Sequence, residues 1–156
     1  MNTQTRLEFA ERLLAEWSRG TSAPQPHRLD VIIDPGDLLA AAGALVRSDW
    51  GYLAAITGMD PGVATGALWV LYHFAKGAAV VTLRITVPRD KPAVPTLHHL
   101  VPLSEIYERE LSEILGVEII GMADKSRLFI PDDWPEGVYP MRKEFEMADA
   151  IAEGQK

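Results

Sequence analysis

Carboxylates and histidines are the side chains of this sequence whose types could support chemistry. Glu108 and Glu110 could act as a general acid and a general base, because two carboxylates in different environments can divide those roles. On a helix, however, residues two positions apart diverge by about 160°, so the two groups would not converge on one reacting atom. Asp132 and His99 are further candidates. A small stand-alone hydrolase or lyase that uses these residues therefore stays open as an alternative.

Neither metal nor phosphate chemistry is favoured by the spacing of the candidates. His98 and His99 are adjacent, so they point apart in a strand or a helix and do not suit one metal ion. Asp132 and Asp133 could hold magnesium, but no phosphate-cradling glycine loop accompanies them. The sequence contains no cysteine, which excludes iron–sulfur clusters, a nickel–iron centre and thiolate zinc sites held by this chain. We therefore expect an interaction protein without a cofactor or metal of its own.

Charge and hydropathy limit the classes of partner. The 156 residues include 22 acidic and 15 basic side chains, and the net charge of −7 disfavours nucleic acid and anionic lipid surfaces. No apolar run approaches the ~20 residues that a spanning helix needs, so no direct membrane span is expected. The first 20 residues are charged and amphipathic and lack the apolar core of a signal peptide. We therefore expect a cytoplasmic protein.

Hydrophobic periodicity predicts the elements that must position these residues. Apolar residues at helical spacing predict a helix over residues 3–18, with Thr3 as its cap. Residues 21–27 contain two prolines and no periodicity, so they are predicted to be a linker before a core that begins near His27. Strands are predicted in that core at residues 29–33, 52–57, 68–74 and 79–87.

The strand at residues 79–87 shows the clearest pattern, because its apolar residues alternate with polar ones such as Thr82. This alternation predicts a sheet with one buried and one solvated face. Residues 34–37 supply turn and cap chemistry for a helix of roughly ten residues, and Lys76-Gly77 suits a hairpin. The proline-rich run at residues 87–95 is predicted to be an exposed loop.

A second long helix is predicted to begin at a Ser104 cap and to end at Gly116. Glu105 and Glu113 each lie one turn from Arg109 and are expected to form ordinary ion pairs with it. The predicted apolar stripe contains Leu103, Tyr107, Leu111, Ile114 and Leu115. These elements predict an α+β fold, in which two main helices pack on a mixed or antiparallel sheet and an extended C-terminal arm follows.

The end of the chain is interpreted as an arm that lies on another surface. Residues 130–145 combine three prolines and four large apolar residues with alternating blocks of charge. Proline lacks a backbone donor and fixes φ, so neither a long helix nor a central strand fits, yet Trp134 and Tyr139 must lose water. The predicted organisation is an N-terminal helix and linker at 1–26, an α+β core domain at 27–130, and a docking arm and tail at 131–156.

The order of residues between Glu108 and Phe145 resembles the signature of a known family. It reads Glu108-Arg109-Glu110, Glu113, Gly116-Val117, Gly121, Arg127-Leu128, Pro131-Asp132-Asp133-Trp134 and Pro140-Met141-Arg142-Lys143-Glu144-Phe145. This order is similar to that of the small peripheral-arm subunit of complex I, the NADH:quinone oxidoreductase. It also looks like the related subunit or domain of energy-converting nickel–iron hydrogenases. Met122 and Ser126 depart from the family pattern.

The resemblance implies a cofactor-free structural and assembly subunit of a membrane-associated redox complex. It implies docking on the large catalytic subunit homologous to the hydrogenase large chain, near the cluster-bearing small subunit. Iron–sulfur clusters, quinone or a nickel–iron centre would then belong to those partners, and the chain would be peripheral to the inner (cell) membrane through the complex. The implied interface residues are Glu108, Arg109, Glu110, Arg127, Asp132, Asp133, Trp134, Tyr139, Pro140, Arg142, Lys143 and Phe145. An adaptor that binds peptides through an exposed sheet is a third hypothesis.

Overall fold

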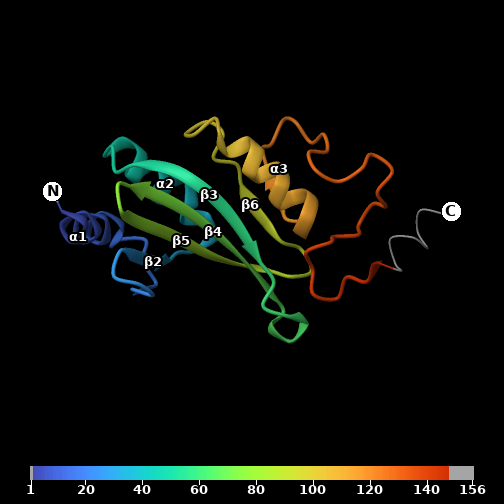
Figure 1. Cartoon of the computed structure of the whole chain (residues 1–156), viewed down its shortest axis with the longest axis horizontal. Coiled ribbons are helices and arrows are strands. Elements are labelled where there is room, and N and C mark those ends of the chain that lie inside the picture. The colour runs from blue at the N-terminus through green and yellow to red at the C-terminus, as the bar shows by residue number, and fades with distance from the viewer. Residues whose placement is uncertain (1, 148–156) are drawn as a thin grey trace.

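A computed structural model describes residues 2–147, so the predicted tail at 148–156 lies outside the described residues (Figure 1). The helices are α1 (Thr3–Leu14), α2 (Leu38–Arg47) and α3 (Ser104–Leu115). The strands are β1 (Gly20–Ser22), β2 (Arg28–Ile32), β3 (Tyr52–Met59), β4 (Ala67–Lys76), β5 (Ala79–Pro88), β6 (Ala93–Pro95) and β7 (Glu118–Ile120). Within this part of the chain, each helix is too short or too polar to cross a membrane.

The larger sheet is mixed, and the predicted α+β fold is confirmed. Its strand order is β1-β2-β5-β4-β3, in which β2 runs parallel to β5 and the other neighbours are antiparallel. The strands β4 and β5 pair along their whole length and turn at Gly77, whose φ is +63°. Glycine adopts this left-handed conformation without a steric penalty, so the hairpin predicted at Lys76-Gly77 is confirmed.

The helices cover one face of this sheet. Val70 and Leu83 point to that face from β4 and β5, and they belong to the same buried cluster as Leu7 and Leu14 of α1. α1 therefore also packs on the sheet, in addition to the two helices that were expected there. The core is continuous across the boundary predicted at residue 26, and the division into segments stays a prediction. α3 lies beside β3 and β6, toward the end of the molecule that carries the C-terminal segment (Figure 1).

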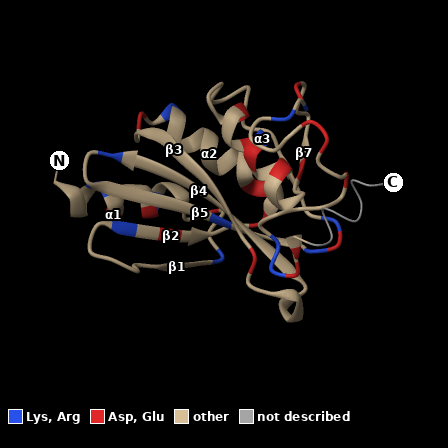
Figure 2. Ribbon diagram, turned by 45° about the vertical axis from the view of Figure 1, so that its right-hand side comes forward, with Lys and Arg blue, Asp and Glu red and all other residues tan. Residues whose placement is uncertain are grey.

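The opposite face of the sheet carries no helix among the described residues (Figures 1 and 2). This agrees with the alternation that predicted one solvated face. Thr82 is an exception, because it is completely buried on that face. His73 and Arg28 of the neighbouring strands reach its hydroxyl at 3.0 and 3.5 Å and cover it.

Boundaries near the N-terminus differ from the prediction. Asn2, and not Thr3, caps α1, since its side chain accepts a hydrogen bond from the Thr5 N–H at 2.8 Å. The helix ends at Leu14. Residues 20–22 form the edge strand β1 instead of irregular linker, because their backbone pairs with β2. A three-residue strand is too short to show a hydrophobic pattern of its own.

The proline-rich run at residues 87–95 is not an exposed loop throughout, so that prediction is wrong. Ala93–Pro95 form β6, which pairs in parallel with β7. Val94 is completely buried and Arg89 is 9% exposed. Prolines are tolerated here because β6 pairs along one edge in a two-stranded sheet and Pro95 stands at its end.

The start of α3 also differs from the prediction, whereas its end agrees. Leu103 precedes the helix, and Ser104 lies inside it with a buried side chain, so Ser104 is not the cap. Leu103 is 52% exposed and does not belong to the apolar stripe, although Leu111 and Leu115 do. Gly116 ends the helix with φ +72°, as predicted.

Candidate functional site

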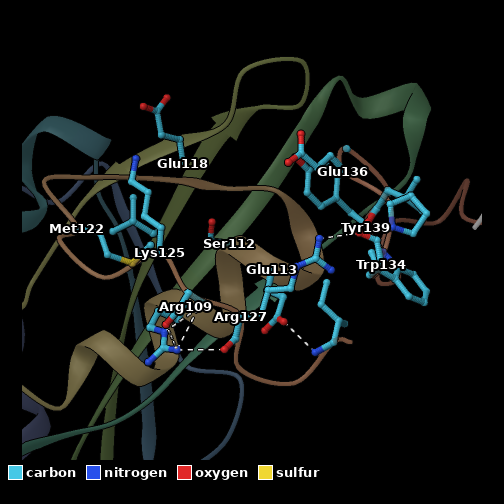
Figure 3. A pocket seen from close by; sticks show the side chains of 16 residues that line it. Arg109, Ser112, Glu113, Glu118, Met122, Lys125, Arg127, Trp134, Glu136 and Tyr139 are labelled. Carbon is cyan, nitrogen blue, oxygen red and sulfur yellow. Dashed lines mark hydrogen bonds between the residues drawn. The ribbon is translucent and has the colours of Figure 1, made fainter. Parts of the chain in front are cut away.

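The C-terminal segment, residues 121–147, lies against α3 and β7, and a cavity of about 200 Å³ lies between them (Figure 3). The helix contributes Arg109 and Glu113 to its lining, and the arm, residues 131–145, contributes Trp134 and Tyr139. The segment contains no strand or long helix, as its prolines predicted. Figure 2 shows acidic residues concentrated on α3 and both signs of charge along the segment. Four of the twelve predicted interface residues line the cavity, namely Arg109, Arg127, Trp134 and Tyr139.

Arg109 and Arg127 hold the segment by binding its backbone oxygens. The Arg109 guanidinium donates to the Ser126 carbonyl at 3.0 Å and lies 3.3 Å from the Asp124 carboxylate. Arg127 donates to the carbonyls of Pro131 and Trp134, both at 2.6 Å. Each planar guanidinium thus fixes the course of its own chain, which is a use of arginine that lysine could not replace.

The ion pairs predicted between Arg109 and the glutamates of its own helix are wrong. Glu113 instead accepts hydrogen bonds from three successive backbone N–H groups, those of residues 128–130, at 2.8 to 3.2 Å. Glu105 lies 3.1 Å from the His98 ring. A carboxylate that accepts several backbone N–H bonds is strongly stabilised, and an exposed ion pair one turn away contributes only a few tenths of a kcal/mol.

Glu108 and Glu110 occupy different environments. Glu108 is completely buried, and its carboxylate accepts hydrogen bonds from the Thr96 hydroxyl and the Leu97 N–H, both at 2.6 Å. It fixes the loop that leads from β6 into α3. Glu110 is half-buried. Glu108 therefore has no exposed surface for a partner, and neither glutamate lines the cavity beside α3.

The other residues of the hydrolase or lyase alternative do not gather around that cavity either. Asp132 and His99 are exposed and do not line it. Within residues 2–147, no group of three or more acidic or histidine side chains is arranged to hold a metal ion. The arrangement gives the acid–base hypothesis no common site on which its residues converge.

The arm caps the C-terminal end of α3. The Met141 N–H donates to the Ile114 carbonyl at 3.0 Å, and the Arg142 Nε donates to the Leu115 carbonyl at 2.8 Å. The last carbonyls of a helix lack partners within it and carry partial negative charge, so a guanidinium is favourable there. Tyr139 packs directly on Gly116, where a Cβ would lie 2.3 Å from its ring.

The far end of the arm is attached to the β3–β4 hairpin. The Lys143 N–H donates to Asp60 at 2.8 Å, and the Glu144 carboxylate pairs with Arg89. Asp60, Arg89 and Glu144 were not predicted to be site residues from the sequence. Glu144 stood in the family signature, and Asp60 and Arg89 each stood beside a proline in a predicted turn or loop. Neither signal predicts that the three side chains meet in space.

Several residues of the C-terminal segment remain available at the surface. Trp134 and Phe145 stack with ring centroids 5.9 Å apart, and both are half-buried. Phe129 and Met141 are 65% and 60% exposed, and neither was predicted to be an interface residue. Among the predicted interface residues, Asp132, Asp133 and Lys143 are exposed and Pro140 is half-buried. This surface combines apolar and charged groups.

Comparisons with known proteins place this architecture among subunits of redox complexes. The family model described as Respiratory-chain NADH dehydrogenase, 30 Kd subunit, matches residues 31–150. The chain is 37% identical over 73 residues to the membrane-bound hydrogenase subunit beta of Pyrococcus furiosus, covering 47% of this chain and 42% of that protein. It is 34% identical over 97 residues to formate hydrogenlyase subunit 5 of Escherichia coli, covering 60% of this chain and 17% of that protein.

A solved structure shares the fold. A chain of the membrane-bound sulfane sulfur reductase, an archaeal respiratory membrane complex, matches with a TM-score of 0.77 at 22% identity, covering 94% of this chain and 89% of that chain. This chain spans less than half the length of either curated relative. Because the family model covers most of the sequence, the chain belongs to the family of the 30 Kd subunit of respiratory-chain NADH dehydrogenase.

Proposed function

We propose that this chain is a cofactor-free structural and assembly subunit of a membrane-associated redox complex of the NADH:quinone oxidoreductase or energy-converting hydrogenase type. It docks on the large catalytic subunit that is homologous to the hydrogenase large chain. Iron–sulfur clusters, quinone or a nickel–iron centre belong to the partner subunits, because this chain has no cysteine to ligate such metals. Its place is at the cytoplasmic side of the membrane, through the complex.

The observation that carries this proposal is the construction of the C-terminal segment. Arg109, Arg127 and Glu113 hold an irregular segment in one course, yet Phe129 and Met141 stay more than half exposed on it. Large apolar side chains that are rigidly held and exposed are typical of interaction surfaces, and interface cores are enriched in aromatic residues and methionine.

The longer relatives support the choice of partner. The segment matched in formate hydrogenlyase subunit 5 of Escherichia coli makes up 17% of that protein, so the rest of that chain is covalently tied to a domain like this one. A domain that is fused to a larger one in a relative is well placed to bind the separate counterpart of that larger part. Fusion makes binding intramolecular, and a separate subunit needs a docking surface instead.

Co-purification from native membranes tests the proposal. Mass spectrometry of the proteins retained by a tagged chain is expected to identify a large subunit and a cysteine-rich small subunit. Deletion of residues 131–146 is expected to abolish their retention, and Trp134→Ala is expected to weaken association by more than ~2 kcal/mol. Because Trp134 also donates to the Val138 carbonyl of its own chain, Phe129→Ala and Met141→Ala test the exposed surface without breaking that bond.

A matched control comes from the opposite end of the molecule. Phe9 on α1 is 37% exposed, so Phe9→Ala removes an exposed aromatic ring far from the arm and is expected to leave co-purification unchanged. Full retention of both subunits by the deletion variant would show that the arm is not the docking element. Turnover of a substrate by the isolated chain would overturn the proposal as a whole.

A further inference from the structure

A buried ion pair joins the β3–β4 hairpin to the end of β5. The side chains of Asp60 and Arg89 are 2% and 10% exposed. The Asp60 carboxylate accepts four hydrogen bonds: two from the Arg89 guanidinium, one from the Gly62 N–H at 2.8 Å and one from the Lys143 N–H at 2.8 Å. Four donors fill the lone-pair directions of a carboxylate, so this acid is fully satisfied within its own chain.

Arg89 extends the same network to the arm. Its guanidinium also pairs with Glu144, and its backbone carbonyl accepts a hydrogen bond from the Arg142 guanidinium at 3.1 Å. Its backbone N–H donates to the Gly66 carbonyl at 2.9 Å in the hairpin. One ion pair therefore contacts the hairpin on one side and residues 142–144 of the arm on the other.

We infer that Asp60 is a positioning residue for the arm: through Arg89 and the Lys143 N–H it holds residues 142–144 against the β3–β4 hairpin, so that the chain presents a preformed arm to its partner. This inference rests on the proposed docking function. Only the fraction of molecules with the arm in its binding geometry can dock directly, and a preformed arm avoids the entropic cost of ordering it at that moment.

The electrostatics of the pair favour a permanent attachment. Hydrogen bonds from Arg89 hold the pKa of Asp60 well below its ordinary value, against the opposing effect of burial. A carboxyl with a depressed pKa stabilises the folded state above its ordinary value of 3.8, and this effect is lost only as the pH falls through the lower folded value. The attachment therefore persists across physiological pH, and the arm is not released by mild acidification.

Amide hydrogen exchange of the isolated full chain tests the attachment without any partner. In Asp60→Asn the amides of Met141, Lys143 and Phe145 are expected to exchange roughly tenfold faster, because the charge-assisted bonds to Arg89 and Lys143 weaken. Amides within β4 and β5 report the fold and are expected to keep their rates. The matched control is Asp49→Asn, since the Asp49 side chain is 99% exposed in a turn and does not contact the arm.

The effect of the held arm on docking is tested by measuring association of the same variants with the co-purified large subunit. Asp60→Asn is expected to slow association by roughly the factor by which the arm amides lose protection, with a smaller effect on dissociation. If Asp60→Asn does not fold, Glu144→Gln decides the matter, because Glu144 is 49% exposed and its loss removes one arm contact without uncovering a buried charge.

The outcomes separate this inference from the proposed function. Unchanged arm exchange in both variants overturns the positioning role of Asp60. A second outcome is faster exchange with unchanged association, while deletion of residues 131–146 still abolishes docking. That outcome also overturns the inference, because the arm would dock equally well without being held by Asp60, and it leaves the docking function intact. Unchanged association after that deletion overturns arm docking itself, whatever the exchange rates are. Faster exchange together with slower association supports the inference.

Discussion

The two ends of this molecule are stabilised by different interactions. At the sheet end, α1, α2 and the five strands bury aliphatic and aromatic side chains and share a continuous backbone ladder. At the other end, charged side chains hold an irregular segment through bonds to its backbone: Arg109 of α3 and Arg127 of the segment itself donate to carbonyls, and Glu113 of α3 accepts from N–H groups. Apolar burial is the main stabilising interaction at the sheet end, whereas charge-assisted hydrogen bonds hold the C-terminal segment at the other end.

This difference changes how the charged residues of the family signature are interpreted. Glu108, Arg109 and Arg127 were predicted to contact a partner, and Glu113 was predicted to pair with Arg109. The structure instead uses the polar atoms of all four within the chain, in other contacts. A signature can thus record what builds a surface and not what the surface binds. The groups left for a partner are those the segment exposes, among them Phe129 and Met141.

The largest expected loss of stability at the α3 end comes from removal of the Glu108 carboxylate. Glu108→Ala leaves the buried Thr96 hydroxyl and the Leu97 N–H without their acceptor, and we expect a loss of roughly 3 kcal/mol in the free energy of unfolding. Denaturant titration measures this loss. Glu110→Ala is the matched control two residues away on the same helix, and is expected to change stability by less than about 0.5 kcal/mol. Equal effects of the two substitutions would contradict the structural role of Glu108.

A smaller effect is expected from adding a side chain at Gly116, where the end of α3 contacts the Tyr139 ring of the arm. In Gly116→Ala the new Cβ would lie 2.3 Å from the Tyr139 ring at a residue with φ +72°, so both strain and displacement of the arm follow. We expect a loss of about 2 kcal/mol, of which about 1 kcal/mol is the left-handed conformation itself. Thermal or denaturant unfolding measures the loss, and amide exchange at Met141 reports the displacement.

Gly137→Ala separates the two contributions to that effect. Gly137 has φ +76°, and no atom lies within 4 Å of the place that a Cβ would take, so its substitution carries the conformational cost alone. It is expected to leave the Met141 amide protected. If Gly116→Ala and Gly137→Ala loosen the arm equally, the packing of Tyr139 on Gly116 does not hold the arm in place.

The sheet end could be predicted from the sequence because its information is local. Alternation indicated the strand at residues 79–87, the glycine in Lys76-Gly77 indicated the hairpin, and turn residues indicated the start of α2. The strands β1, β6 and β7 were missed, since three residues carry no period and their pairing depends on strands elsewhere in the chain.

The α3 end could be predicted only in part, because its interactions join residues that are distant in the sequence. Local spacing favoured pairing of Arg109 with Glu113, but the returning segment offers Glu113 three backbone donors that no spacing rule anticipates. Arg89 lies 29 residues from Asp60 and 55 from Glu144, so their meeting is a consequence of the tertiary fold. Gly116 was found because a helix stop is a local signal.

The smallest predicted effect concerns a polar row on the uncovered face of the sheet. The His73 ring of β4 lies 3.0 Å from the Thr82 hydroxyl of β5 and 3.1 Å from the Thr57 hydroxyl of β3, so this ring bridges the three strands. Burial, and then the positive charge of Arg28, lower the pKa of His73 below its ordinary value of 6.5, although Asp30 acts in the opposite direction. The ring is therefore neutral in the folded protein near neutral pH.

The sign of the resulting pH dependence follows from proton counting. Below about pH 6.5 the unfolded chain binds a proton at this histidine that the folded chain resists, so the free energy of unfolding falls as the pH decreases. One histidine contributes at most about 1.4 kcal/mol per pH unit. Denaturant titrations across this range are expected to show a shallower slope for His73→Gln, whereas His27→Gln, at an exposed position, is expected to keep the original slope. An unchanged slope in His73→Gln would mean that side-chain hydrogen bonding on the bare face adds no pH sensitivity to an end of the molecule otherwise stabilised by apolar burial.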